Sequence, residues 1–145
     1  LLSPLYEFFK PEPEAAEALS AALRLYAQTL VVETEEHLKQ VLQFAEKYEL
    51  HDFSLVCLEH IRNVHLSESH NSFGGLLSKV EQNPIACHFL KSIEIWETAA
   101  KAVEALIHSF GKIEGWASGG GYIDQRGVFF KIKSSENQVF LRESE

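Results

Sequence analysis

The chain has 145 residues, of which 46% are hydrophobic and 23% are charged, values typical of one globular domain with a real core. Its net charge of −8 at pH 7 argues against a nucleic-acid or anionic-membrane surface, because an acidic protein gains nothing from counterion release. No apolar run approaches the ~20 residues needed to cross a bilayer, so the sequence predicts a soluble domain without a membrane or nucleic-acid partner.

The first third of the chain is expected to be mainly helical. Strong helix formers run from Glu14 to about Tyr26, after two prolines that favour a helix start. Thr29–Val32 is a short link of β-forming residues. Thr34 then has the position of an N-cap, and the apolar residues that follow it are spaced along one face of an amphipathic helix.

A second capped helix is predicted directly afterwards. Asp52 is its expected N-cap, and its apolar residues run from Phe53 to Ile61. Since the connection from Glu49 to Asp52 is very short, the sequence predicts that the two helices pack on each other.

The longest predicted element is a single amphipathic helix from Ile85 to Phe110. Asn83 and Pro84 form a cap and first turn, and Gly111 supplies the stop. Apolar residues recur along this stretch with a mean spacing near 3.6, which predicts one continuous apolar stripe. These residues are Ile85, Phe89, Ile93, Trp96, Ala100, Val103, Ile107 and Phe110.

The C-terminal tail changes to β-forming residues. Gly115–Gly121 is expected to form a turn or hinge, followed by a strand at Tyr122–Ile123 and a second at Val128–Lys133. A third short strand is predicted at Val139–Leu141. The triple glycine leads into a strand rather than a helix N-terminus, which argues against a phosphate-binding loop.

Residues 23–61 carry a resemblance to a known family. Leu23–Leu30 is similar to the segment that precedes a Thr-capped helix in the C-terminal half of BTB/POZ domains. The Thr34 cap, the Ala45–Leu50 junction and the Cys57–Ile61 helix follow in the same order. The resemblance implies a protein-binding module, and in many members of that family the partner is a cullin scaffold of ubiquitin ligases. Leu5-Tyr6-Glu7 resembles the short motif that some members use for that contact.

Candidate metal ligands are few. Cys57 and His60 are one helical turn apart, and thiolate and imidazole both bind zinc. His65 lies about 140° further round a helix from His60, so these groups do not converge. A buried cysteine with solvated histidines is the preferred interpretation, and neither a metal nor a cofactor is predicted.

The sequence therefore predicts a mainly α, α+β fold: a helical bundle with a long C-terminal amphipathic helix and a small antiparallel β-meander. Residues 1–114 form the expected helical domain, and residues 115–145 form a meander appended to it. The expected function is a cytoplasmic interaction or adaptor module that binds another protein or itself. The alternative is a small-ligand or enzymatic domain that uses the histidine-bearing helices, although a non-enzyme is favoured. Candidate partner-binding residues are Leu5, Tyr6, Glu7, Trp116 and Phe129.

Overall fold

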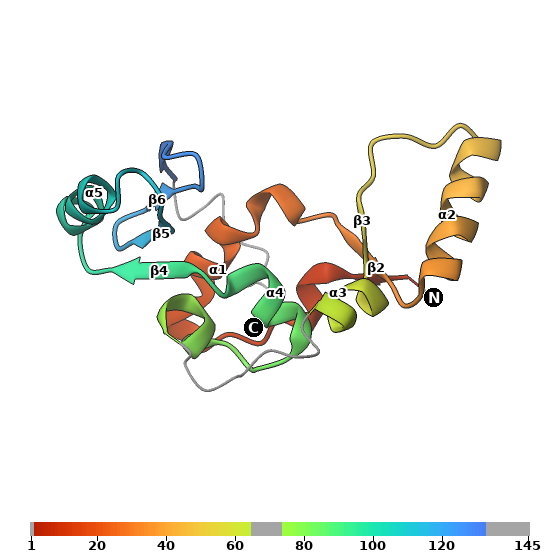
Figure 1. Cartoon of the computed structure of the whole chain (residues 1–145), viewed down its shortest axis with the longest axis horizontal. Coiled ribbons are helices and arrows are strands. Elements are labelled where there is room, and N and C mark those ends of the chain that lie inside the picture. Colours follow the sequence, from red (N-terminus) through yellow and green to blue (C-terminus); the bar gives the residue numbers. More distant parts are fainter. Residues whose placement is uncertain (1, 65–73, 133–145) are drawn as a thin grey trace.

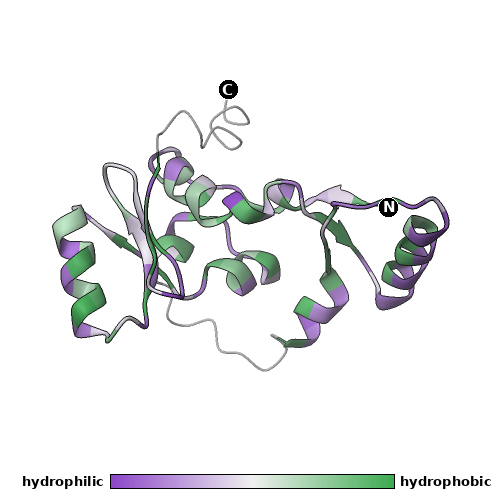
Figure 2. Ribbon diagram, turned by 90° about the horizontal axis from the view of Figure 1, so that it is seen from above, coloured by the Kyte–Doolittle hydropathy of each residue, from purple (hydrophilic) through white to green (hydrophobic). Residues whose placement is uncertain are grey.

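The structure, a computed structural model, describes residues 2–64 and 74–132. The chain forms an elongated molecule with a small sheet toward each end and short helices between them (Figure 1). One sheet has the strand order β1-β2-β3 and the other the order β4-β5-β6-β7. The helices α2 and α5 lie at opposite ends of the molecule (Figure 2).

The first sheet is built around a parallel βαβ unit. Strand β2 (Leu30–Val32) pairs antiparallel with β1 (Ser3–Pro4) and parallel with β3 (Leu55–Cys57). Helix α2 (Glu35–Lys47) connects β2 to β3. Its start follows the sequence prediction, because the Thr34 hydroxyl accepts a hydrogen bond from the His37 amide at 3.0 Å.

The second sheet contains a similar unit. Strand β4 (Ile93–Trp96) leads through α5 (Ala99–His108) to the parallel strand β5 (Glu114–Ala117). The antiparallel strands β6 (Gly121–Ile123) and β7 (Phe129–Lys131) complete it. Thr98 caps α5 just as Thr34 caps α2, and a glutamate precedes each threonine. This is an internal repeat that the sequence analysis did not detect.

Short helices fill the centre. They are η1 (Leu5–Phe8), η2 (Pro13–Ala15), α1 (Ala16–Ala22), η3 (Arg24–Tyr26), α3 (Leu58–Val64), η4 (Gly75–Lys79) and α4 (Pro84–Leu90). Helix α1 is buried on nearly every side and contacts β5, so it forms the middle of the main core. A smaller core joins Ala102 of α5 to Ala117 and Ile123 of the second sheet.

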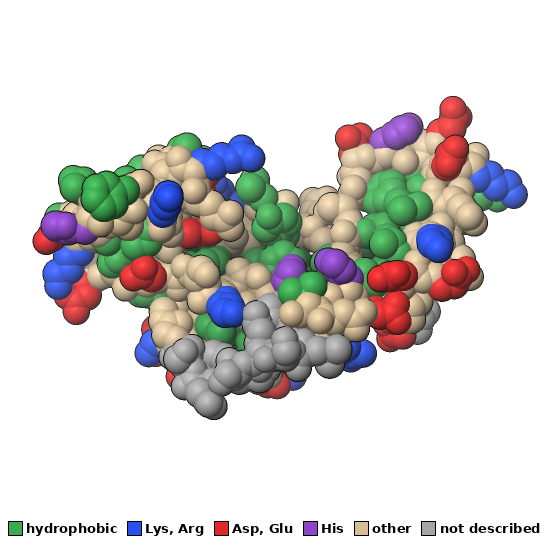
Figure 3. Space-filling view, viewed as in Figure 1, with side chains coloured by type: hydrophobic (Ala, Val, Ile, Leu, Met, Phe, Trp, Pro, Cys, Tyr) green, Lys and Arg blue, Asp and Glu red, His purple; other side chains and the backbone are tan. Residues whose placement is uncertain are grey.

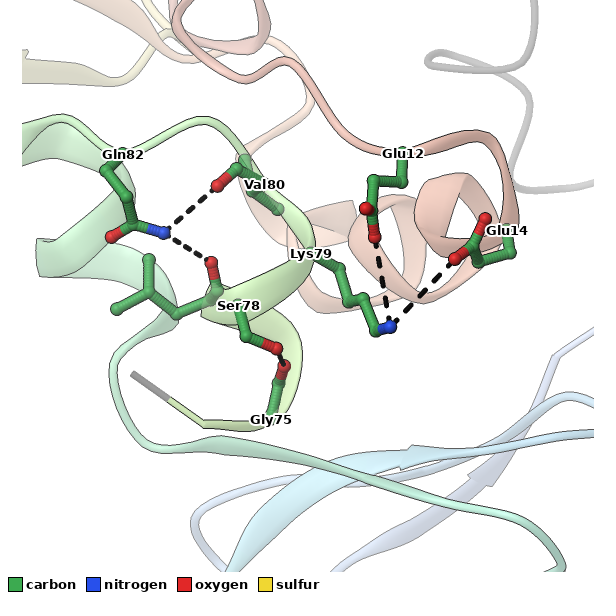
Figure 4. Close-up of polar contacts among 8 residues, drawn as sticks. Glu12, Glu14, Gly75, Ser78, Lys79, Val80 and Gln82 are labelled. Carbon is green, nitrogen blue, oxygen red and sulfur yellow. Dashed lines mark hydrogen bonds and ion pairs between the residues drawn. The ribbon is translucent and has the colours of Figure 1, made fainter. Parts of the chain in front are cut away.

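The η4 segment is fixed by local polar contacts (Figure 4). The Gln82 side-chain amide donates to the carbonyls of Leu77 at 2.7 Å and Val80 at 3.0 Å. Lys79 Nζ lies 3.9 Å from carboxylate oxygens of both Glu12 and Glu14. These ion pairs are exposed, so they stabilise the fold only slightly. The two hydrogen bonds from the Gln82 side chain therefore contribute more to holding the end of η4 in place.

The predicted fold class is wrong. The expected helix from Ile85 to Phe110 is three elements, α4, β4 and α5. Ile93–Trp96 is rich in β-branched and aromatic residues, and its pairing with β5, about twenty residues later in the chain, decides its conformation. The tail strands do form, but they belong to a mixed sheet that includes β4 rather than to a separate meander.

The predicted second helix is also partly wrong. Leu55–Cys57 is a strand and only Leu58–Val64 is helical. Asp52 has a φ of 61°, whereas an N-cap typically has an extended conformation, and α3 begins only at Leu58. The strand predicted at Val139–Leu141 lies outside the described residues. The boundary predicted at residue 114 stays a prediction, although β4 and β5 pair across it. Within residues 2–64 and 74–132, no helix combines the length and apolar character needed to cross a membrane.

Candidate interaction surfaces

Strand β7 is an open edge of the second sheet within the described part of the chain. The Ile132 amide donates to the Gly120 carbonyl, and the Val128 carbonyl accepts from the Asp124 amide. Residues 128, 130 and 132 therefore face β6. Because hydrogen-bonding groups alternate along an antiparallel strand, Phe129 and Lys131 direct their N–H and C=O groups away from the sheet.

Strand β3 is the corresponding open edge of the first sheet. The Ser54 carbonyl accepts a hydrogen bond from the Leu30 amide, so alternate residues from Ser54 onward face β2. Leu55 and Cys57 consequently direct their backbone groups outward. Each sheet thus offers one strand that can accept a further strand.

The other two edge strands are less accessible. Strand β4 is covered by η4: a Cβ atom on Gly75 would lie 2.2 Å from the Ile93 carbonyl oxygen. Strand β1 has two residues, and one of them is Pro4, which has no N–H to donate. Within residues 2–64 and 74–132, the open edges are therefore β3 and β7.

An apolar surface accompanies α5. Ala102 faces the sheet and is fully buried, whereas Val103, Ile107 and Phe110 are 43%, 67% and 91% exposed. These exposed residues belong to the apolar stripe that the sequence analysis predicted from Ile85 to Phe110. Figure 3 shows hydrophobic side chains gathered on this end of the molecule.

Phe129 belongs to the same face of the second sheet as α5. It pairs directly with Ile123, which packs with Ala102, and directly opposed residues share a face. The tip of its ring lies over Gly121, since a Cβ there would be 2.7 Å from the ring Cζ. Phe129 is 40% exposed, so this face stays open beside the β7 edge.

Helix α2 carries a second exposed apolar surface. Its buried residue is Ala45, while Leu42 is 47% exposed on one flank. On the other flank the rings of Phe44 and Tyr48 are in tilted contact, with centroids 4.6 Å apart. A helix of an isolated domain would bury more of such residues, so both ends of the molecule have the character of interaction surfaces.

Comparisons with known proteins agree with this geometry. The family model "SMC proteins Flexible Hinge Domain" matches residues 1–106, which is more than half of the chain. This chain belongs to the SMC hinge domain family. The hinge family is one whose members self-associate, which agrees with the prediction of another protein or a second copy as partner.

Solved structures show the same fold. An asymmetric dimer of the Geobacillus stearothermophilus SMC hinge domain matches with a TM-score of 0.69 and 16% identity, over 97% of this chain and 64% of that chain. The Pyrococcus furiosus Smc hinge domain with an extended coiled coil matches with a TM-score of 0.70 and 22% identity, over 98% and 54%. This chain therefore spans less than two thirds of either. Among curated proteins, none matches it.

The BTB/POZ resemblance is wrong, because the hinge family model covers the residues that carried it. The helix–helix junction expected from that family is a helix followed by a strand here. The hinge domain is an interaction module and not a ubiquitin-ligase adaptor. Its family is a dimerisation domain rather than a catalytic one, which fits the preference for a non-enzyme.

The predicted contact residues lie in different environments. Leu5 and Trp116 are 1% and 6% exposed and belong to the main core of the hinge domain. Tyr6 is half-buried and Glu7 is exposed. Phe129 is the one that lies beside an open strand edge. The sequence analysis missed Leu55 and Cys57, because β3 was taken for part of a helix.

The weak metal candidates also separate. Cys57 is buried at the end of β3, whereas His60 is exposed on α3. No group of three or more histidine, cysteine or acidic side chains suited to a metal occurs among the described residues. His65 lies outside them.

One buried polar contact supports the second sheet of the hinge domain. The Tyr122 hydroxyl donates a hydrogen bond to the Glu114 carboxylate. Burial first, and the bond to Glu114 second, raise the pKa of Tyr122 well above its ordinary value. The Arg24 guanidinium lies 4.1 Å from the ring centroid of Phe130 and 5.5 Å from that of Tyr122. Arg24, Glu114 and Tyr122 line a groove of about 260 Å³, and the contacts of Arg24 with Tyr122 and Phe130 hold β6 and β7 against η3.

Proposed function

We propose that this hinge domain joins a second copy of itself by strand pairing, with β3 of one copy antiparallel to β7 of the other. The observation that carries the proposal is the pair of open edges. Leu55 and Cys57 on β3, and Phe129 and Lys131 on β7, direct backbone donors and acceptors outward. Addition of a strand to an exposed edge is a common mode of protein recognition.

The two edges belong to different sheets at opposite ends of the elongated molecule (Figure 2). In a pair of copies, β3 and β7 of each can therefore be used at the same time. Such an arrangement is closed and two-fold symmetric, and it leaves neither edge open. A single contact would instead leave a free β3 and a free β7, which is the pattern that extends into filaments.

Strand pairing alone is too weak to hold two copies together. Each hydrogen bond contributes only about 1 kcal/mol net, and short strands such as β3 and β7 form few of them. Association costs at least ~4 kcal/mol in lost translational and rotational freedom. The exposed apolar residues beside the edges must therefore be buried as well, and Phe129 is the nearest of them to β7.

Lys131→Pro tests the proposal, with Lys131→Ala as its matched control. Both variants lose the hydrogen bond from Lys131 Nζ to the Gly119 carbonyl, but only proline removes the outward N–H. Measured by sedimentation velocity over a concentration series, Lys131→Pro should raise the dimer dissociation constant at least about tenfold, the equivalent of ~1.4 kcal/mol. Lys131→Ala should keep the wild-type value. A wild-type chain that stays monomeric throughout, or a proline variant that dimerises normally, would contradict the proposal.

A further inference from the structure

Phe110 is an unusual residue for its position. It follows α5 as the left-handed C′ residue, with a φ of 57°. The Gly111 amide donates to the Leu106 carbonyl and the Phe110 amide to the Ile107 carbonyl, which defines a Schellman cap. Glycine is the usual residue there, because a side chain makes the left-handed conformation costly. Phe110 is nevertheless aromatic and 91% exposed, so neither backbone conformation nor core packing accounts for it.

Phe110 is part of a continuous apolar surface that reaches β7. The carbonyl oxygen of Gly111 lies 3.8 Å from the position of a Cβ on Gly127, so the end of α5 contacts the turn between β6 and β7. Phe129 follows that turn, lies on the α5 face of the sheet and is 40% exposed. We call Ile107, Phe110 and Phe129 the α5 patch.

We infer that the α5 patch is the docking surface for α2 of the second copy, with Phe110 as its anchor. This inference rests on the proposed pairing of β3 with β7. Stable interfaces bury about 800 Å² per partner, far more than two three-residue strands supply. The α5 patch borders the β7 edge directly, and a buried aromatic ring contributes on the order of 150–250 Å².

The handedness of the two βαβ units identifies the element that meets the patch. Crossovers between parallel strands are right-handed in about 98% of cases. When β3 pairs antiparallel with β7 of the other copy, this handedness places α2 and the other copy's α5 on the same face of the joined sheet. Helix α2 lies over β2 and β3, and α5 lies over β4 and β5. In the joined sheet, strands β6 and β7 then lie between α2 of one copy and α5 of the other.

The separation leaves room for side chains but not for contact between the helix backbones. Four strand spacings of about 4.8 Å put the helix axes roughly 19 Å apart, whereas packed helices are about 8–10 Å apart. The trough between them has Phe129 on its floor and Phe110 at its side. Leu42 and Phe44 lie about 200° apart around α2, and the right-handed crossover turns the flank of Leu42 toward the trough.

The test uses four single variants and one double variant of the whole chain. Phe110→Gly removes the anchor and also relieves the backbone, so it should raise the dimer dissociation constant on the order of thirtyfold. At concentrations where the protein is monomeric, the same variant should raise Tm by about 3 °C. Leu42→Ala should weaken the dimer, and Phe44→Ala on the opposite flank of α2 should leave it unchanged. Leu25→Ala removes a 78% exposed leucine from η3 and should also leave it unchanged.

The double variant Leu42→Ala/Phe110→Gly identifies the occupant of the patch. If the two side chains meet across the interface, the combined rise in the dissociation constant is smaller than the product of the single effects. If the combined rise in the dissociation constant equals the product of the two single effects, the assignment of α2 to the patch is overturned. An unchanged dissociation constant for Phe110→Gly, while Lys131→Pro abolishes the dimer, overturns this inference and leaves strand pairing intact. A lower Tm for Phe110→Gly makes Phe110 a structural residue and also overturns it. A wild-type monomer overturns both proposals.

Discussion

Glu49 and Phe110 occupy equivalent positions in the two halves of the fold. Each is the left-handed C′ residue of the helix in its βαβ unit, with φ angles of 54° and 57°. In both caps the following amide donates to the carbonyl five residues earlier, Leu50 to Ala45 and Gly111 to Leu106. The two units therefore share their N-cap, their C-cap and their parallel pairing, while their exposed side chains differ.

The cap of α2 is expected to carry backbone strain that glycine would remove. Glu49→Gly should raise the free energy of unfolding by about 1 kcal/mol, because glycine adopts the left-handed conformation without a Cβ penalty. Urea denaturation, monitored by far-ultraviolet circular dichroism, measures this free energy of unfolding. The control is Glu46→Gly, the same substitution inside α2, which should lower the free energy of unfolding by about 1 kcal/mol. Effects of the same sign in both variants would contradict the role of the cap.

Gly75 is expected to be essential for the packing of η4 against the edge of β4. A Cβ there would lie 2.2 Å from the Ile93 carbonyl oxygen, and the φ of Gly75 is +58°. Because neither backbone can move away cheaply, Gly75→Ala should lower the free energy of unfolding by more than about 2 kcal/mol. Gly74→Ala is the matched control, since no described atom beyond its chain neighbours lies within 4 Å of its Cβ position. It should raise stability by about 0.5 kcal/mol. Equal unfolding midpoints for the two variants would show that η4 does not seal β4.

Local sequence signals predicted the helix starts at Thr34 and Asn83, but they misplaced the start after Asp52 and missed the start at Thr98 and most of the strands. Thr34 and the helix after it were identified because a cap and its periodicity lie within a few residues of each other. Strand β4 was missed because Ile93 and Trp96 also fit a helical spacing. What decides the conformation is the partner strand around Trp116, which no local pattern contains. Strand β3 was missed for the same reason.

The α5 stripe shows why interaction surfaces are hard to recognise from sequence. Val103, Ile107 and Phe110 have the spacing of a core-facing stripe, yet Ala102 faces the sheet. Alanine allows the helix to lie close to the sheet at Ala117, whereas the larger residues are left on the outer flank. A stripe that is buried only in a complex has the same sequence pattern as a stripe that is buried in the monomer.

Tyr122 is expected to make the stability of the domain depend on alkaline pH. Burial, followed by the Glu114 hydrogen bond, raises the pKa of the Tyr122 hydroxyl above its ordinary 10.0. In the unfolded chain this group ionises near pH 10, while in the folded chain it stays protonated. Its stabilising contribution is therefore fully present below pH 10 and falls as the pH rises further. The free energy of unfolding should fall more steeply between about pH 10 and 11.5 for wild type than for Tyr122→Phe. Parallel curves would mean that Tyr122 ionises equally in both states.

The proposed strand pairing also predicts a specific covalent link between two copies. Antiparallel pairing that brings Leu55 opposite Lys131 brings Cys57 opposite Phe129, on the face shared by α2 and α5. The Cα atoms of such a pair lie about 5.5 Å apart, within the range that a disulfide spans. Phe129→Cys should therefore form a disulfide-linked dimer through the native Cys57 under mild oxidation, visible on non-reducing gels. Phe129→Cys/Cys57→Ser should lose the link, and Arg126→Cys in the exposed β6–β7 turn should not form it. A crosslink to Cys57 from Lys131→Cys but not from Phe129→Cys would shift the register by two residues, and a link from neither would contradict the pairing of β3 with β7.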